Sequence, residues 1–166
     1  LEQTILALKN FQSKYKNFKF VIVGDGVEKL NLENQVRELN LNKNVIFLND
    51  VSLKLKNSLI KVADFFIMPS IQVGKSVEGF GISFLESAKY GTPSIGGVVG
   101  GASDIIKHNE TGILCDGEKH EEIYHSLIKM MEDNNYKIFG ENSKKISKNF
   151  SWDIQIKKYL NLIDKK

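Results

Sequence analysis

Two glutamates lie on either side of a glycine-flanked turn near the middle of the chain. Glu78 precedes the turn at residues 79–81, and Glu86 lies eight positions later, one turn inside the helix expected to follow. Such a turn leaves the N–H groups of Ile82 and Ser83 without intrahelical partners, and a helix start of this kind attracts an anion such as a diphosphate. A carboxylate nearby can accept hydrogen bonds from the vicinal hydroxyls of a sugar or ribose.

A plainer interpretation is that Glu78 is a loop charge and Glu86 a solvated helix residue. For either glutamate alone this is the commoner outcome. However, Phe84, Leu85 and Ala88 make the surroundings of Glu86 apolar, so an unpaired charge there is costly unless it faces an opening or a partner. The pair is therefore a candidate site.

The rest of the chain alternates short apolar runs with amphipathic segments, which predicts an α/β fold built around a mostly parallel sheet. From residue 118 onward the pattern predicts three C-terminal helices, with breaks near Asn134 and Phe150. The expected helices cover residues 1–15, 27–39, 52–62, 82–90 and 102–107, and the expected strands cover residues 18–23, 44–48, 64–68, 93–95 and 112–114. Ser52 is the expected N-cap of its helix.

The domain organisation is expected to be a single unit, residues 1–166, because no Pro-rich or Gly/Ser-rich linker divides the chain. Residue 1 already lies inside a helical pattern, whereas an α/β unit normally opens with a strand. We therefore expect the chain to be a fragment that lacks its first strand.

Composition narrows the classes of function. The formal net charge is +3 and Arg37 is the only arginine, so neither the charge balance nor bidentate arginine contacts point to a nucleic-acid partner. The lone Cys115 ends an apolar run and is expected to be a buried strand thiol rather than a nucleophile. The absence of a long apolar stretch and of a secretory leader makes a reducing cytoplasm the expected setting.

A second glycine pair, Gly24 and Gly26, directly follows the first expected strand. Missing side chains there let the backbone approach a ligand at the carboxyl end of the strand, and a tight turn is an equally good interpretation. Lys29 stands where a dinucleotide fingerprint needs its third glycine, so binding of NAD is not indicated.

Other short motifs fail on spacing. Gly74-Lys75-Ser76 resembles the end of a phosphate-binding loop, but Pro69 stands where the first glycine belongs. His120 and His125 are five residues apart and cannot share a zinc-binding helix face. No metal site is expected.

Taken together, these residues resemble the E-x7-E region of the group 1 glycosyltransferases of the GT-B fold, in which two Rossmann-like domains face each other across a cleft. The resemblance covers essentially the whole chain. Besides Glu78 and Glu86, its motifs are Gly24-Asp25-Gly26, Ala63-Asp64, Pro69-Ser70, Gly91-Thr92-Pro93, Gly100-Gly101, Asn109-Glu110-Thr111-Gly112 and Phe150-Ser151-Trp152. It implies a three-layer, Rossmann-like C-terminal half that binds the donor nucleotide.

The resemblance also implies a role for each matching position. Glu86 would bind the ribose hydroxyls of the donor, and Glu78 would lie beside the transferred sugar, near the reacting centre. The remaining roles belong to the backbone. The amides of Phe80 and Gly81 would contact the sugar, and those of Ile82 and Ser83 would contact the diphosphate. Gly24 and Gly26 would border the nucleotide, and the base would lie near the loop after Leu48.

The implied activity is transfer of a sugar from a nucleotide diphosphate sugar to an acceptor hydroxyl with retention of configuration and without a metal or other cofactor. The acceptor, a glycan or lipid-linked saccharide, would bind a missing N-terminal domain, and the full-length protein could associate peripherally with a membrane. The family's usual diphosphate-binding Arg and Lys would precede Leu1, so the isolated fragment is expected to be inactive. Two alternatives stay open, a non-catalytic nucleotide-binding module and a nucleotide-sugar epimerase of GT-B fold.

Overall fold

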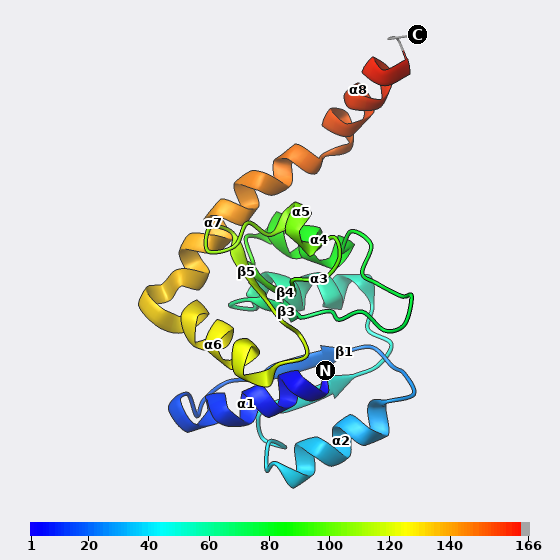
Figure 1. The fold of residues 1–166 in the computed structure, drawn as a ribbon. Helices are drawn as coiled ribbons and strands as arrows, with labels where there is room; N and C mark the ends of the chain where they lie inside the picture. The colour runs from blue at the N-terminus through cyan, green and yellow to red at the C-terminus, as the bar shows by residue number, and fades with distance from the viewer. Residues whose placement is uncertain (164–166) are drawn as a thin grey trace.

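The computed structural model describes residues 1–163 and has an α/β fold in which helices flank parallel strands (Figure 1). The expected alternation of strands and helices is confirmed. The strands are β1 (Phe20–Val23), β2 (Val45–Leu48), β3 (Phe66–Met68), β4 (Ser94–Gly97) and β5 (Gly112–Cys115). The α-helices are α1 (Glu2–Lys14), α2 (Lys29–Glu38), α3 (Leu53–Val62), α4 (Ile82–Tyr90), α5 (Ala102–Ile105), α6 (His120–Met131), α7 (Asn135–Ser147) and α8 (Trp152–Ile163), with short 3-10 turns at Glu132–Asn134 and Lys148–Phe150.

All strand pairs are parallel, as expected, but their hydrogen bonds form two sheets. One sheet has the order β1-β2 and the other β3-β4-β5. In the three-stranded sheet, Ile67 is opposite Ile95, which is opposite Ile113. Because parallel strands point the same way, their carboxyl ends open onto one edge of each sheet, where ligands of such folds usually bind.

Local signals explain most helix boundaries. Ser52 caps α3 as expected, because its hydroxyl accepts a hydrogen bond from the N–H of Leu55 at 3.2 Å. Helix α4 has the expected bounds, since Gly91 ends it in the left-handed conformation that glycine adopts at low cost. Strand β3 begins at Phe66 rather than at Asp64, because the ladder to β4 starts with the N–H of Phe66 bonding to the carbonyl of Pro93.

One main hydrophobic cluster holds the two sheets together. It contains Ile5 and Leu8 of α1, Val45 of β2, and Ile95 and Ile113 of the other sheet. A second cluster, around Phe84 of α4, packs α5 against the region of the site. The burial of Cys115 at 4% exposure raises the pKa of its thiol to about 11, so the thiol is protonated near neutral pH and the expected buried strand position is confirmed.

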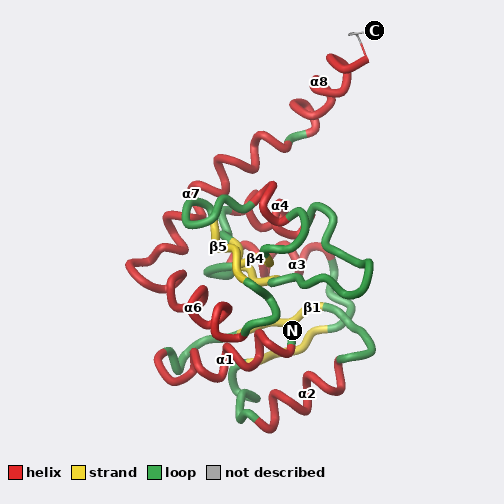
Figure 2. Tube along the Cα trace, in the orientation of Figure 1, coloured by secondary structure: helices red, strands yellow, loops and turns green. Residues whose placement is uncertain are grey.

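The C-terminal end of the chain contains the three expected helices. Helices α6 and α7 pack against the body, whereas α8 extends away from it (Figure 1). Figure 2 shows the long loop between β3 and α4, which carries the first of the two glutamates. Within residues 1–163, no helix is long and apolar enough to cross a membrane.

The buried face of α1 can be tested by shortening one leucine. Leu8 is 3% exposed and lies in the main cluster, so Leu8→Ala is expected to lower the free energy of unfolding by about 2–5 kcal/mol. Urea denaturation followed by circular dichroism measures the change. The matched control is Leu30→Ala in α2, where the leucine is 64% exposed and the expected change is within about 0.5 kcal/mol. Equal effects of the two substitutions would contradict the packing of α1.

Candidate functional site

The candidate site is the loop that runs from the carboxyl end of β3 to the start of α4, residues 69–81. Within it, Val73 and Ser76 exchange backbone hydrogen bonds of 3.0 and 2.9 Å and close a tight turn at Gly74. The segment that resembles a phosphate-binding loop is therefore a surface turn and does not lead into a helix, which agrees with the spacing argument.

Gly81 sets the geometry of the helix start. Its φ of 76° and ψ of 59° are left-handed, and a Cβ at this position would collide with the ring of Phe84. Gly81 also has no side chain that could cap the helix. Within residues 1–163, the N–H groups of Ile82 and Ser83 consequently have no hydrogen-bond acceptor, so they are free to bind an anion.

Glu78 lies beside a cavity of about 350 Å³ next to this bend. The cavity is lined by Ser70, Ile71, Val73, Ser76, Val77, Glu78 and Gly79. The carbonyl of Glu78 accepts a hydrogen bond of 3.0 Å from the N–H of Gly101, at the start of α5. A Cβ on Gly101 would collide with the carbonyl oxygen of Gly79, so the close approach of the two loops requires glycine there.

Glu86 has a partner that the sequence did not reveal. The ammonium group of Lys56, on α3, lies 2.8 Å from one carboxylate oxygen of Glu86 and 2.9 Å from the other. Both side chains are about one-third exposed, at 34% each. The expectation that a charge at this position needs an opening or a partner is met by a partner from a neighbouring helix, while Glu86 itself does not line the cavity of Glu78.

The remaining expected site residues lie around this region in different settings. Gly24 has a φ of 131° and donates its N–H to the carbonyl of Leu48 at 2.9 Å, at the carboxyl ends of β1 and β2. A Cβ added to Gly24 or to Gly26 would meet no atom within 4 Å. The ring of Phe80 packs against Phe150, with centroids 5.7 Å apart, which leaves its backbone as the group available to a ligand. The roles assigned to all these residues stay predictions.

Lys56 is the residue of this region that the sequence analysis missed. It is one of many lysines spread along helical stretches, and 30 positions separate it from Glu86. The one available signal was the apolar environment of Glu86, which required some partner without identifying it.

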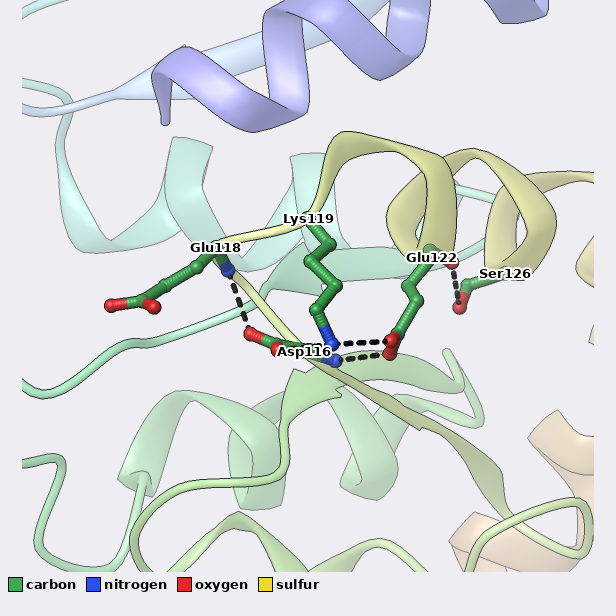
Figure 3. A network of polar contacts seen from close by, with 5 residues as sticks. All are labelled: Asp116, Glu118, Lys119, Glu122 and Ser126. Carbon is green, nitrogen blue, oxygen red and sulfur yellow. Dashed lines mark hydrogen bonds and ion pairs between the residues drawn. The ribbon is translucent and has the colours of Figure 1, made fainter.

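The loop after β5 packs closely against the start of the site loop. Gly117 lies so close to Pro69 that a Cβ would collide with the carbonyl oxygen of Pro69. Figure 3 shows the ion pairs that connect this loop to α6. The ammonium nitrogen of Lys119 lies 3.0 Å from a carboxylate oxygen of Asp116 and 3.2 Å from one of Glu122. A backbone hydrogen bond from Glu118, followed by the ammonium of Lys119, lowers the pKa of Asp116.

Within residues 1–163, no group of three or more His, Cys, Asp or Glu side chains is arranged to hold a metal ion. The available chemistry of the site therefore consists of backbone N–H groups, two carboxylates, one of them clamped by a lysine, and a small cavity. The expectation that no metal or other cofactor is needed stays a prediction.

The described structure thus combines a parallel α/β fold with a glycine bend that lies between two acids in the sequence. The chain belongs to the family described as group 1 glycosyl transferases, since residues 1–149 match that family. Its fold is that of the C-terminal domain of the group 1 glycosyl transferase LpcC from Francisella tularensis, with a TM-score of 0.78 at 21% identity over 89% of this chain and 77% of that one.

Two relatives illustrate how far the similarity extends. A GDP-mannose-dependent phosphatidylinositol monomannoside mannosyltransferase of Mycobacterium tuberculosis is 30% identical over 78% of this chain and 34% of its own length. An uncharacterized glycosyltransferase of Methanocaldococcus jannaschii is 30% identical over 98% of this chain and 40% of its own length. The chain thus spans about a third to two-fifths of these relatives. HepE of Anabaena, solved in complex with UDP, matches with a TM-score of 0.79 at 22% identity over 96% of this chain and 44% of that one.

The contact between Gly101 and the site loop can be tested with a single methyl group. Gly101→Ala is expected to displace the backbone of Gly79 and to lower the free energy of unfolding by about 1–3 kcal/mol, as overpacking does. Urea denaturation provides the measurement. Gly26→Ala is the control, because its added Cβ would meet no atom within 4 Å; if both variants unfold at the wild-type urea concentration, the close packing of the two loops is wrong.

The network at Asp116 and Glu122 predicts a dependence of stability on pH. Hydrogen bonds from backbone and from Lys119 lower the pKa of both carboxyls, so the network stabilises the fold above their ordinary values. This contribution is lost as pH falls through the lowered values, below about pH 4. Lys119→Ala should therefore lower the melting temperature at pH 7, and the gap to wild type should close near pH 3.

The control for this series is Lys129→Ala, which removes an exposed lysine from α6, the helix that directly follows Lys119. Its melting temperature should follow that of the wild type at every pH. A gap between Lys119→Ala and wild type that stays constant down to pH 3 would show that the network does not titrate as described.

Proposed function

We propose that the full-length protein transfers a sugar from a nucleotide diphosphate sugar to an acceptor hydroxyl with retention of configuration, and that this chain supplies the half that binds the donor. Membership of the group 1 glycosyl transferases supports the reaction class. Retention is proposed from the E-x7-E pattern of Glu78 and Glu86. The chain alone is proposed to bind donor without catalysing transfer.

The observation that carries the proposal is the start of α4. The N–H groups of Ile82 and Ser83, which have no acceptor within residues 1–163, lie at the positive end of the helix dipole. Gly79, three residues before Ile82, lines the cavity next to Glu78. A diphosphate bound there receives hydrogen bonds that strengthen as negative charge develops on the leaving group. HepE, which shares this fold, has been solved with UDP and with UDP-glucose.

Each further residue has a proposed task. Glu86 accepts hydrogen bonds from the ribose hydroxyls, Gly24 and Gly26 border the nucleotide, and the backbone of Phe80 and Gly81 contacts the sugar. Glu78, next to the cavity, orients the transferred sugar at the reacting centre. In a front-face displacement, an oxygen of the departing diphosphate helps to accept the proton of the acceptor hydroxyl, so Glu78 need not act as a nucleophile.

The partners follow from the same assignment. The proposed donor is a nucleotide sugar, and the proposed acceptor is a glycan or a lipid-linked saccharide that binds a second domain outside this chain. A cytoplasmic location and peripheral attachment of the full-length protein to the inner face of a membrane are part of this proposal, because lipid-linked acceptors are presented there. One relative acts, by its name, on a phosphatidylinositol mannoside.

Nucleotide binding by the 166-residue chain tests the proposal. UDP, GDP and ADP are titrated while the melting temperature is followed, and the nucleotide with the preferred base is expected to stabilise the chain most. At a concentration of 100 Kd, this nucleotide should raise the free energy of unfolding by about 2.7 kcal/mol. Glu86→Ala should weaken binding of that nucleotide about tenfold, because it removes charge-assisted hydrogen bonds to the ribose.

Glu141→Ala on α7 is the matched control, since this glutamate is exposed and lies outside the site. It should bind nucleotide like the wild type. If none of the three nucleotides stabilises the wild-type chain, the donor-binding role is wrong. If Glu86→Ala binds as tightly as Glu141→Ala, only the ribose assignment fails.

A further inference from the structure

The Lys56–Glu86 pair links α3 to α4, about one helical turn after the helix start proposed as the anion site. Helix α3 packs against α4, and the ammonium group of Lys56 reaches both carboxylate oxygens of Glu86, at 2.8 and 2.9 Å. Both side chains keep 34% of their surface exposed. The pair is therefore held in one geometry while it remains accessible to a ligand.

The location of the pair matters because of charge. Glu86 lies four residues after Ile82 on α4, which is about 6 Å along the helix axis. An isolated carboxylate at that distance would repel a diphosphate bound at the helix start. The ammonium of Lys56 cancels this charge, so the anion-binding property of the helix start is preserved.

The pairing also leaves room for a ligand. A carboxylate offers about four acceptor positions, two on each oxygen, and an ammonium has three N–H donors. Lys56 occupies one acceptor position on each oxygen of Glu86 and uses at most two of its own donors. The carboxylate keeps one acceptor position on each oxygen, which suits two vicinal hydroxyls, and the ammonium keeps one donor for an oxygen of the same ligand.

We propose that Lys56 is a positioning and specificity residue of the donor site: it fixes the carboxylate of Glu86 toward the vicinal hydroxyls of a nucleoside and neutralises that carboxylate so that the same ligand can carry a diphosphate. The proposal rests on the proposed donor-binding function. It assigns to Lys56 a preference for nucleoside diphosphates over nucleosides, an effect that a purely structural lysine would not have.

The experiment compares two ligands that share the ribose and differ in charge. Binding of UDP is measured by calorimetry and binding of uridine by NMR chemical-shift titration, both at low ionic strength. If guanine or adenine is the base that stabilises the chain most, the pair GDP and guanosine or the pair ADP and adenosine is used instead. Lys56→Met retains a long apolar stem without the charge. It is expected to weaken the diphosphate about tenfold and the nucleoside no more than about threefold.

Two further variants separate charge from structure. Lys56→Arg keeps the positive charge and should bind UDP within about threefold of wild type. The double variant Lys56→Met with Glu86→Gln removes the unpaired carboxylate charge while keeping an acceptor, and should bind UDP at least about threefold more tightly than Lys56→Met alone. Lys61→Met, on the same helix, is the matched control and should bind both ligands like the wild type.

The outcomes distinguish the two proposals. If UDP and uridine weaken by the same factor in Lys56→Met, or if Glu86→Gln restores nothing, Lys56 does not act through the charge of Glu86 and this inference is wrong, although the donor site stands. If the wild-type chain binds none of the three diphosphates, the proposed function fails, and the role of Lys56 fails with it.

Discussion

The left-handed conformation of Gly81 is the constraint on which the site depends. Because the chain turns there with a φ of 76°, α4 begins directly after the bend, and no side chain within residues 1–163 caps the N–H groups of its first residues. The ring of Phe84 lies where a Cβ on Gly81 would be, so the turn and the buried cluster beneath it require each other. Replacing the glycine by any other residue would either strain the backbone or expel the aromatic ring.

In the proposed function, the site binds negative charge mainly with dipoles. The only arginine of the chain lies on α2. The bend itself presents backbone N–H groups, with Glu78 just before it and Glu86 about one helical turn after it. In such a site each carboxylate affects how well an anion is tolerated, which gives the contact of Glu86 with Lys56 its importance. In the proposed role, Lys56 offsets a charge that would oppose the anion, while the carboxylate of Glu86 can still accept hydrogen bonds.

The loop that carries Glu78 is long, and close backbone contacts support it at several points. The N–H of Gly101 holds the carbonyl of Glu78, and Gly117 lies against Pro69. These supports come from the loops after β4 and β5, so all three loops at the carboxyl edge of the sheet are packed together. This explains why glycines recur after successive strands, since side chains there would keep the loops apart.

The sequence by itself determined the elements, because hydrophobic periodicity and capping act between residues a few positions apart. It located α4 with its full bounds, the cap at Ser52, the buried Cys115 and the bend between the two acids. Only the tertiary structure decided that the strands form two separate sheets, that Glu78 borders a cavity and that Lys56 clamps Glu86. Such contacts depend on how helices and loops far apart in the chain pack together, and no local pattern of residue types encodes that packing.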